Sequence, residues 1–287
     1  MHEQVWINGQ VVAMSEARVG VEDRGFQFAD GVYEVIRIYN GRPFALEEHL
    51  QRLERSSEGI RLPSPAKHAA LRERSLADEI RGLVKQSGLT DGMVYLQYTR
   101  GSSPRNHVYP ACEPTLLFYV RALPPAVAPG QAAGLRLISV PDERWRRCWV
   151  KSIALLPNVL AKNAAIDAGA DEAVFVDEGI VTECSASNFY AVIGGKLVTH
   201  PVGPRVLPGI TRLVLLEAAR RLGIAVEERS LPERQALAAD ELFITSTTRE
   251  IGWVAQWNGK QFGTACGPVT LKLHQGLVEA VKQATGD

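Results

Sequence analysis

Residues 144–190 read RWRRCWVKSIALLPNVLAKNAAIDAGADEAVFVDEGIVTECSASNFY and contain Lys151 within a run of bulky apolar residues and Glu183 at the end of a β-type run. Lys151 follows the apolar run 148–150. An apolar setting disfavours the ammonium form of a lysine, and a neutral amine can form a Schiff base with a carbonyl group. The alternative is a lysine whose stem packs at the edge of a strand while its head stays in water. This stretch alone leaves both interpretations open.

The composition predicts an ordinary globular protein. The chain has 287 residues, of which 46% are hydrophobic and 22% charged, and its 32 basic residues balance its 32 acidic ones. No net charge attracts nucleic acid or an anionic membrane, and no apolar run is long enough for a transmembrane helix. The four cysteines form no CxxC pair, and the N-terminus lacks a signal-peptide pattern. We therefore expect a cytoplasmic protein that has neither a structural zinc site nor disulfides.

Residues 1–122 are predicted to form a small α+β domain. The dipeptides Asn8-Gly9 and Asn40-Gly41 are typical of tight hairpin turns. Apolar residues recur at helical spacing over 45–60, and a second helix is expected over 65–86. Two alternating strands follow, joined by the polar loop SSPRNHVYPACE at 102–113.

Residues 123–134 are rich in Pro, Gly and Ala and are the expected interdomain linker. Residues 135–287 form the expected larger C-terminal domain, in which strand hairpins turn at Glu178-Gly179 and Gly194-Gly195. Three longer helices are expected there, at about 157–169, 207–223 and 269–283. The fold class is therefore α+β or α/β with two domains.

Three separated segments suggest an anion site. Gly209, Ile210 and Thr211 stand at a helix N-terminus, where unpaired N–H groups favour a phosphate. Residues 245–248 form a hydroxyl-rich turn, and Arg52 offers a guanidinium fork. Singly, these are also compatible with a helix cap, a polar turn and a solvated charge. Together with a candidate Schiff-base lysine they indicate a phosphorylated aldehyde cofactor.

The chain resembles the fold type IV pyridoxal-phosphate enzymes of the branched-chain and D-amino acid aminotransferase superfamily, and within it most closely the D-amino acid transaminases. Nucleotide-binding, zinc-protease and serine-hydrolase motifs are absent, and the six histidines are dispersed, so no metal site is expected. The matching segments are EDRGFQFADGVYEVIRIYNG (22–41), EEHLQRL (47–53), YTRGSSPRNH (98–107), RWRRCWVKS (144–152), NVLAKNAA (158–165), VTECSASNFY (181–190), LPGITR (207–212) and ITSTTREI (244–251).

The resemblance implies pyridoxal 5'-phosphate as cofactor and assigns the roles around it. Lys151 is the implied catalytic Schiff-base lysine, whereas Lys162 on the following helix lies at a position that the family does not use. Glu183 is the carboxylate that keeps the pyridine nitrogen protonated, and Arg144 lies near the phenolic oxygen. The remaining implied cofactor-binding residues are Arg52, Ser185, Ser187, Leu207, Ile210, Thr211, Ser246 and Thr247.

Arg105 and His107 match the R-x-H pair with which D-amino acid transaminases, together with a tyrosine (here Tyr33), bind the substrate carboxylate. Thr248 is expected on the same substrate side. In the family this loop reaches the active site of the neighbouring subunit, which implies a homodimer. The alternative interpretation is a flexible polar loop whose charges are solvated.

The implied reaction moves the amino group of a D-amino acid to a 2-oxo acid, 2-oxoglutarate or pyruvate, by a ping-pong mechanism. Three enzyme alternatives remain: a branched-chain L-amino acid transaminase, an (R)-amine transaminase and an aminodeoxychorismate lyase. A cofactor-binding paralogue without activity is disfavoured because Lys151 and Glu183 are both present. Phe26, Cys184 and Ala186 depart from the family pattern and put the detail of cofactor hydrogen bonding in doubt.

Overall fold

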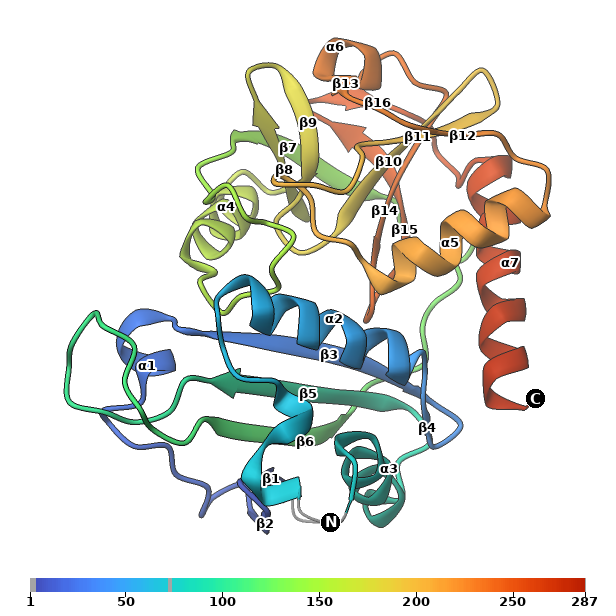
Figure 1. Cartoon of the computed structure of the whole chain (residues 1–287). Coiled ribbons are helices and arrows are strands. Elements are labelled where there is room, and N and C mark those ends of the chain that lie inside the picture. The colour runs from blue at the N-terminus through green and yellow to red at the C-terminus, as the bar shows by residue number, and fades with distance from the viewer. Residues whose placement is uncertain (1–3, 72–73, 287) are drawn as a thin grey trace. The chain divides into compact units, whose positions relative to one another are not determined.

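The structure, a computed structural model, describes residues 4–71 and 74–286 (Figure 1). The chain divides into two compact units. The first unit comprises Met1–Pro125 and Val150–Ala154, and the second comprises Ala126–Trp149 and Leu155–Asp287. The expected division into a small domain over 1–122, a linker over 123–134 and a larger domain over 135–287 stays a prediction.

The first unit is built on a six-stranded antiparallel sheet in the order β2-β1-β6-β5-β3-β4. Its two tight hairpins turn at Asn8-Gly9 and Asn40-Gly41, where all four residues have positive φ, as a two-residue turn between twisted strands requires. The strands are β1 (Gln4–Ile7), β2 (Gln10–Ala13), β3 (Gly31–Tyr39), β4 (Arg42–Pro43), β5 (Gly92–Thr99) and β6 (Thr115–Ala122).

The helices of the first unit are α1 (Arg24–Phe28), α2 (Leu46–Gly59) and α3 (Leu76–Ser87). The expectation of one helix over 65–86 is wrong at its start. Two short 3₁₀ turns, Pro65–Lys67 and Ala69–Leu71, come first. The α-helix begins only after Ser75, whose Oγ accepts a hydrogen bond from Asp78 N at 3.1 Å and caps it.

Helix α2 packs on β3 (Figure 1). One face of β3 is entirely buried at alternate positions, Val32, Glu34, Ile36 and Ile38, as the twofold repeat of a strand dictates. Three of these residues are aliphatic and one is a carboxylate. A charge on a buried strand face must meet a partner on the element that covers it.

The short segment Val150–Ala154 returns to the first unit and lies along β3. Tyr33 N donates to Lys151 O at 3.0 Å, and Ile153 N donates to Gly31 O at 3.1 Å. An isolated antiparallel bridge joins Val32 and Ser152. The sheet thereby fixes the main chain from the Lys151 carbonyl to Ile153.

The second unit contains a ten-stranded mixed sheet in which nine strands follow the order β12-β11-β10-β14-β15-β7-β8-β9-β13 and β16 pairs with β15. The β15–β7, β7–β8 and β11–β12 pairs are parallel. Its strands are β7 (Leu135–Pro141), β8 (Glu172–Asp177), β9 (Ile180–Cys184), β10 (Asn188–Ile193), β11 (Lys196–Thr199), β12 (Val226–Glu228), β13 (Leu231–Pro232), β14 (Glu241–Ser246), β15 (Glu250–Trp257) and β16 (Lys260–Gln261).

Four helices cover this sheet: α4 (Leu156–Asp167), α5 (Ile210–Arg221), α6 (Glu233–Ala236) and α7 (Pro268–Thr285). Helix α4 packs on β7 and β8, whereas α5 and α7 pack on each other and on β14 (Figure 1). Within residues 4–71 and 74–286, none of the helices has the length and apolarity needed to cross a membrane.

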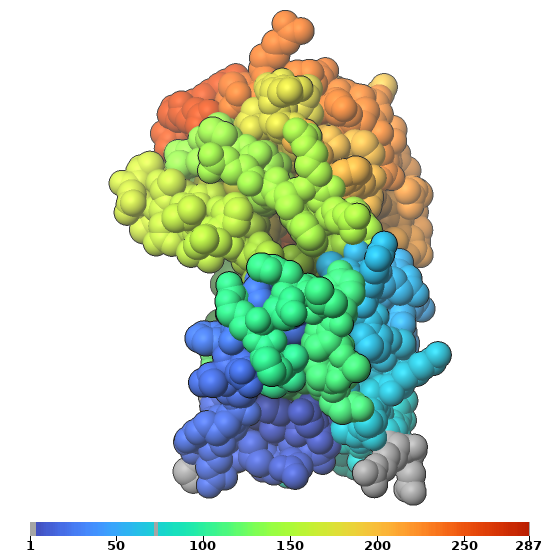
Figure 2. Space-filling view, turned by 60° about the vertical axis from the view of Figure 1, so that its left-hand side comes forward, coloured from blue at the N-terminus to red at the C-terminus, as the bar shows by residue number. Residues whose placement is uncertain are grey.

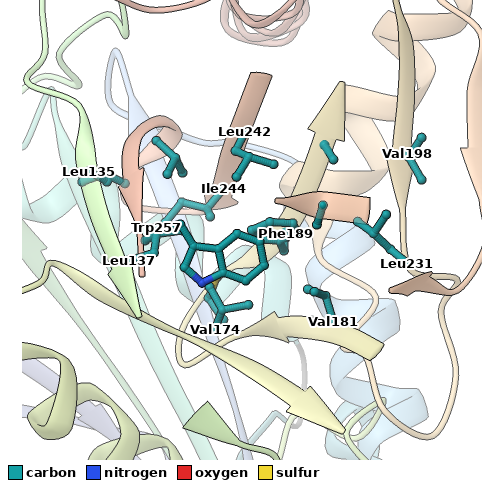
Figure 3. Packing of buried hydrophobic residues seen from close by; sticks show 14 residues of the cluster. Leu135, Leu137, Val174, Val181, Phe189, Val198, Leu231, Leu242, Ile244 and Trp257 are labelled. Atoms are coloured by element: carbon teal, nitrogen blue, oxygen red, sulfur yellow. The ribbon is translucent and has the colours of Figure 1, made fainter. Parts of the chain in front are cut away.

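The largest buried side chain of the second unit is Trp257 at the end of β15 (Figure 3). Its ring lies 5.3 Å from that of Phe189, centroid to centroid, and its Nε1 donates to Ser139 Oγ at 3.0 Å. Aliphatic residues from β7, β8, β9 and β14 surround the pair, so one indole joins strands that are distant in sequence.

Replacing Trp257 by Ala should lower the free energy of unfolding by about 3–5 kcal/mol, because removal of the buried indole leaves a cavity in this core. Urea unfolding followed by circular dichroism measures the loss. The control is Leu213→Ala, at a half-exposed position on α5. Equal midpoints for the two variants would contradict the role of Trp257 in this core.

Candidate active site

Lys151 is half-buried, and its ammonium lies over the ring of Tyr33, with Nζ 4.1 Å from the ring centroid. Its main-chain N donates to Ser56 Oγ on α2 at 3.1 Å. Since Tyr33 N also donates to Lys151 O, both a strand and a helix of the first unit hold this residue. The two sequence-predicted residues Lys151 and Tyr33 are thus neighbours.

Arg52 projects from α2 onto the buried face of β3, where it meets Glu34. Arg52 Nε donates to Glu34 Oε1 at 2.8 Å, and Nη2 donates to Oε2 at 2.7 Å. His49 Nδ1 lies 2.7 Å from the same Oε2. All three side chains are at most 3% exposed. The guanidinium is therefore fixed in orientation by a bidentate carboxylate.

The charges of this cluster are coupled. Burial opposes ionisation of Glu34, but the charge and hydrogen bonds of Arg52, with a smaller contribution from His49, outweigh it and lower the pKa to about 2. Burial also lowers the pKa of His49, against the attraction of Glu34 and with the repulsion of Arg52 and Lys151. Glu34 is thus ionised and His49 neutral near pH 7.

The loop between β5 and β6 lies on the surface of the first unit (Figure 2). Arg105 and His107 belong to this loop, and both are exposed. Both side chains lie against Phe28 of α1. Arg105 Cζ is 4.4 Å from the centroid of that ring, and the His107 ring is 5.3 Å from it. The structure thus brings the R-x-H pair together, and its reach into a neighbouring subunit stays a prediction.

Glu183 is the penultimate residue of β9 in the second unit and is buried. Its Oε2 accepts hydrogen bonds from Asn188 Nδ2 and from Leu207 N, both at 3.1 Å. Its Oε1 accepts from Arg144 Nη1. A carboxylate with three donors has fixed orientation and has lone pairs for a further cationic donor.

Arg144 links Glu183 to a second carboxylate. Its Nε and Nη2 donate to Asp142 at 2.9 and 2.8 Å, and Thr182 Oγ1 donates to Asp142 at 2.9 Å. Burial raises the pKa of Glu183, and the charge and hydrogen bond of Arg144 together with the Leu207 N–H act against that rise. An additional positive charge beside Glu183 would favour its ionised form.

The loop before α5 connects Glu183 with the predicted phosphate segment. Asn188 Nδ2 donates to Leu207 O at 3.0 Å as well as to Glu183. Gly209 is the N-cap of α5, and a Cβ there would collide with Asn188 Oδ1, so only glycine fits. Ile210 and Thr211 are the first two residues of α5, as expected, and stand where helical N–H groups have no intrahelical partner.

The hydroxyl residues of the second unit have different surroundings. Ser185 Oγ donates to buried Glu172, and Ser187 O accepts from Cys184 N at 2.7 Å to close the turn between β9 and β10. Ser246 Oγ accepts from Arg249 N at 3.3 Å in the turn that also contains Thr247 and Thr248. Their binding roles stay predictions.

Two of the residues that depart from the family pattern, Phe26 and Cys184, have small effects on their surroundings. Phe26 is 79% exposed on α1. Cys184 is buried, and burial together with the nearby Glu172 and Glu183 carboxylates holds the pKa of its thiol well above the usual value. The thiol therefore stays neutral and adds no charge beside Glu183.

Glu34, His49 and Asn188 were missed by the sequence analysis. The first two had a signal: Glu34 alternates with aliphatic residues on the buried face of a strand, and His49 stands three residues before Arg52 on an amphipathic helix. A charge at a core position predicts a buried partner. Asn188 had no comparable signal.

Over the part of the chain that the structure describes, no cluster of three or more His, Cys, Asp or Glu residues could hold a metal ion.

The low pKa of Glu34 predicts a pH-dependent stability. Its carboxylate contributes about 3 kcal/mol above its unfolded pKa of 4.5, and this contribution is lost as the pH falls from about 4.5 towards 2. Urea midpoints should show Glu34→Gln far below the native protein at pH 7, with the gap narrowing near pH 3. Glu47→Gln, which alters an exposed ion pair, should show no such gap. A gap that does not depend on pH would contradict the assignment.

The class IV amino-transferase family matches residues 31–257, more than half of the chain. The curated D-alanine aminotransferase of Listeria monocytogenes serotype 4b (strain F2365) is 42% identical over 289 residues, covering 99% of this chain and 98% of the relative. That of Bacillus licheniformis is 39% identical over 284 residues, covering 98% of each. The expected resemblance and the expected enzyme class are therefore confirmed.

Solved structures agree with the fold. The branched-chain amino acid aminotransferase from Escherichia coli has a TM-score of 0.86 and 26% identity, covering 100% of this chain and 95% of that one. The mixed α and β architecture expected for fold type IV is confirmed. This chain belongs to the class IV aminotransferase family.

Proposed function

We propose that this aminotransferase is a pyridoxal-phosphate-dependent D-amino acid transaminase in which Lys151 is the catalytic lysine. The observation that carries the proposal is the placement of Lys151. Its main chain is held by β3 and α2, and its amine lies on the ring of Tyr33. An amine on such a rigid support can act repeatedly at one carbon atom.

The residues present fit the cofactor. Glu183 is a buried carboxyl group whose pKa is raised by burial, so a protonated ring nitrogen beside it would stabilise its ionised form. Leu207 N and Asn188 hold that carboxylate in place. The start of α5 at Ile210 and Thr211 supplies main-chain donors suited to a phosphate.

Arg52 completes the proposed phosphate set. Glu34 holds its guanidinium in one orientation, which lowers the entropy lost when an anion binds. Ser246 and Thr247 are proposed to add hydroxyl donors to the phosphate, and Ser185 and Ser187 to line the cofactor.

Pyridoxal phosphate, when bound, supplies an aldehyde that accepts the amino group and a ring that withdraws electrons from Cα. Lys151 Nζ would take the α-proton of the amino acid and deliver it to the carbon atom of the aldehyde group, and Glu183 would keep the ring nitrogen protonated. The same residues serve when the amino group leaves the D-amino acid and when it is passed to the 2-oxo acid. The two substrates therefore react one after the other, in a ping-pong order.

D-amino acids are the proposed substrates because the two curated relatives above are D-alanine aminotransferases. Arg105, His107 and Tyr33 are proposed to bind the substrate carboxylate, with Thr248 nearby, and the Arg105 loop is proposed to act across a homodimer. A guanidinium and an imidazole suit a carboxylate. 2-Oxoglutarate or pyruvate is the proposed acceptor.

The second candidate is a branched-chain L-amino acid transaminase, favoured by the similarity to the Escherichia coli structure. The two candidates differ in the amino acid that converts the bound cofactor to its amino form. Absorbance spectra after addition of D-alanine or L-leucine separate them. Conversion by L-leucine alone would overturn the D-specific proposal, and an (R)-amine or aminodeoxychorismate substrate can be tested in the same way.

Lys151→Ala should abolish multiple turnover, because the variant lacks the amine that is proposed to transfer the proton. The matched variant is Lys162→Ala on α4, whose Nζ donates to Asp171 O and has no proposed role in the reaction. Steady-state assays and the visible absorbance of the purified proteins measure both effects. Native turnover in Lys151→Ala would overturn the assignment.

Arg105→Ala should raise the KM for D-alanine and for the 2-oxo acid by about 10- to 100-fold, since a charged hydrogen bond to the carboxylate is lost. The change in kcat should be smaller. Arg81→Ala, on the exposed face of α3, serves as the control. A native KM in Arg105→Ala would show that the carboxylate binds elsewhere.

A further inference from the structure

The loop that carries Arg105 and His107 is closed at its base. Gly101 follows β5 with φ of +94°, and a Cβ there would collide with Glu113 O on the other side of the loop. Cys112 Sγ also lies 3.1 Å from Arg100 O. The two ends of the loop are therefore adjacent, and the twelve residues 102–113 form a compact excursion from the sheet.

One carboxylate organises the inner side of this loop. Asp30 accepts from Arg24 Nε at 2.9 Å and from Arg100 Nε at 2.8 Å. Arg24 Nη1 in turn donates to Asn106 O, the residue between the two proposed carboxylate-binding residues. The main chain at Asn106 is thus held by a buried arginine whose own orientation is fixed.

The side chains of the R-x-H pair have a separate support, the ring of Phe28. Arg105 Cζ lies 4.4 Å and Arg24 Cζ 4.7 Å from the ring centroid, and the His107 ring lies 5.3 Å away with an interplanar angle of 48°. Three donor-bearing side chains therefore surround one aromatic ring.

We propose that Phe28 is a positioning residue that holds Arg105 and His107 in the orientation in which they bind a substrate carboxylate. The proposal rests on the proposed function of that pair. In this proposal Phe28 itself does not contact the substrate.

The physical reason is that both side chains are exposed and would otherwise sample many rotamers. Ordering a long side chain costs free energy when a ligand binds, and a contact already made in the free protein removes part of that cost. A guanidinium on an aromatic face retains its N–H donors in its own plane, where a carboxylate can accept them. Removing the ring should therefore weaken binding of both substrates and leave the chemical step nearly unchanged.

The chain contains a matched control on the same short helix. Phe26 is 79% exposed and is two residues from Phe28. We expect Phe28→Leu to raise the KM for D-alanine and for 2-oxoglutarate by roughly two- to tenfold, with kcat within a factor of about two of native. Phe28→Tyr keeps the ring and should restore the native KM, and Phe26→Leu should not change it.

The measurement uses the cofactor-loaded enzyme. Loss of folded protein lowers the apparent kcat and leaves KM in place, so a folding defect is not mistaken for positioning. A native KM in Phe28→Leu, or the same raised KM in Phe28→Tyr, would overturn the proposal. So would an undiminished effect of Phe28→Leu in an Arg105→Ala, His107→Ala background, because the ring is proposed to act through those two residues.

A second readout does not depend on the reaction. Trypsin cleaves after arginine, and release of the loop from Phe28 should speed cleavage after Arg105 in Phe28→Leu relative to Phe26→Leu. Equal cleavage rates would overturn the positioning role. An unchanged KM in Arg105→Ala would overturn the proposed carboxylate site. Faster cleavage in Phe28→Leu would still show that the Phe28 ring holds the loop.

Discussion

The hydrogen bonds between β3 and the main chain of residues 150–154 are the constraint on which the proposed chemistry depends. Tyr33 N donates to Lys151 O, Ile153 N donates to Gly31 O, and Ser56 Oγ accepts from Lys151 N. Without these bonds Lys151 would be a long, mobile side chain on a connecting segment. With them, the main chain of Lys151 is held in place, and its amine lies above the Tyr33 ring.

The neighbouring face of β3 adds a second, electrostatic constraint. Burying Glu34 alone would be very unfavourable, and Arg52 and His49 compensate for it. Well-packed apolar residues can match the net stability of a buried ionic cluster, so the property specific to this cluster is the orientation that it gives to Arg52. The same logic applies to Glu183, which Arg144, Asn188 and Leu207 N hold in place. In both units, a buried carboxylate and a cation fix each other.

Much of this could be predicted from the sequence, for identifiable reasons. The Asn-Gly turns and the periodicity of α2 depend on local chemistry, so hairpins and helix were found where they occur. Helix α1 was missed because its cap, Asp23, is fixed by Thr99 and Thr115, which are far away in sequence. The roles of Lys151 and Glu183 came from the resemblance to a family. Asn188 could not be found, because its contacts with Glu183 and Leu207 exist only after three distant segments have come together.

The return of residues 150–154 to the first unit also limits how this chain can be recombined. A chimera joined within 123–134 would take its first unit from one parent and the short segment containing Lys151 from the other, although that segment pairs with β3 of the first. Both parents would therefore have to agree at Gly31–Tyr33, at Ser56 and at 150–154. In this architecture the inheritance of the proposed catalytic lysine is tied to a strand that ends more than one hundred residues earlier.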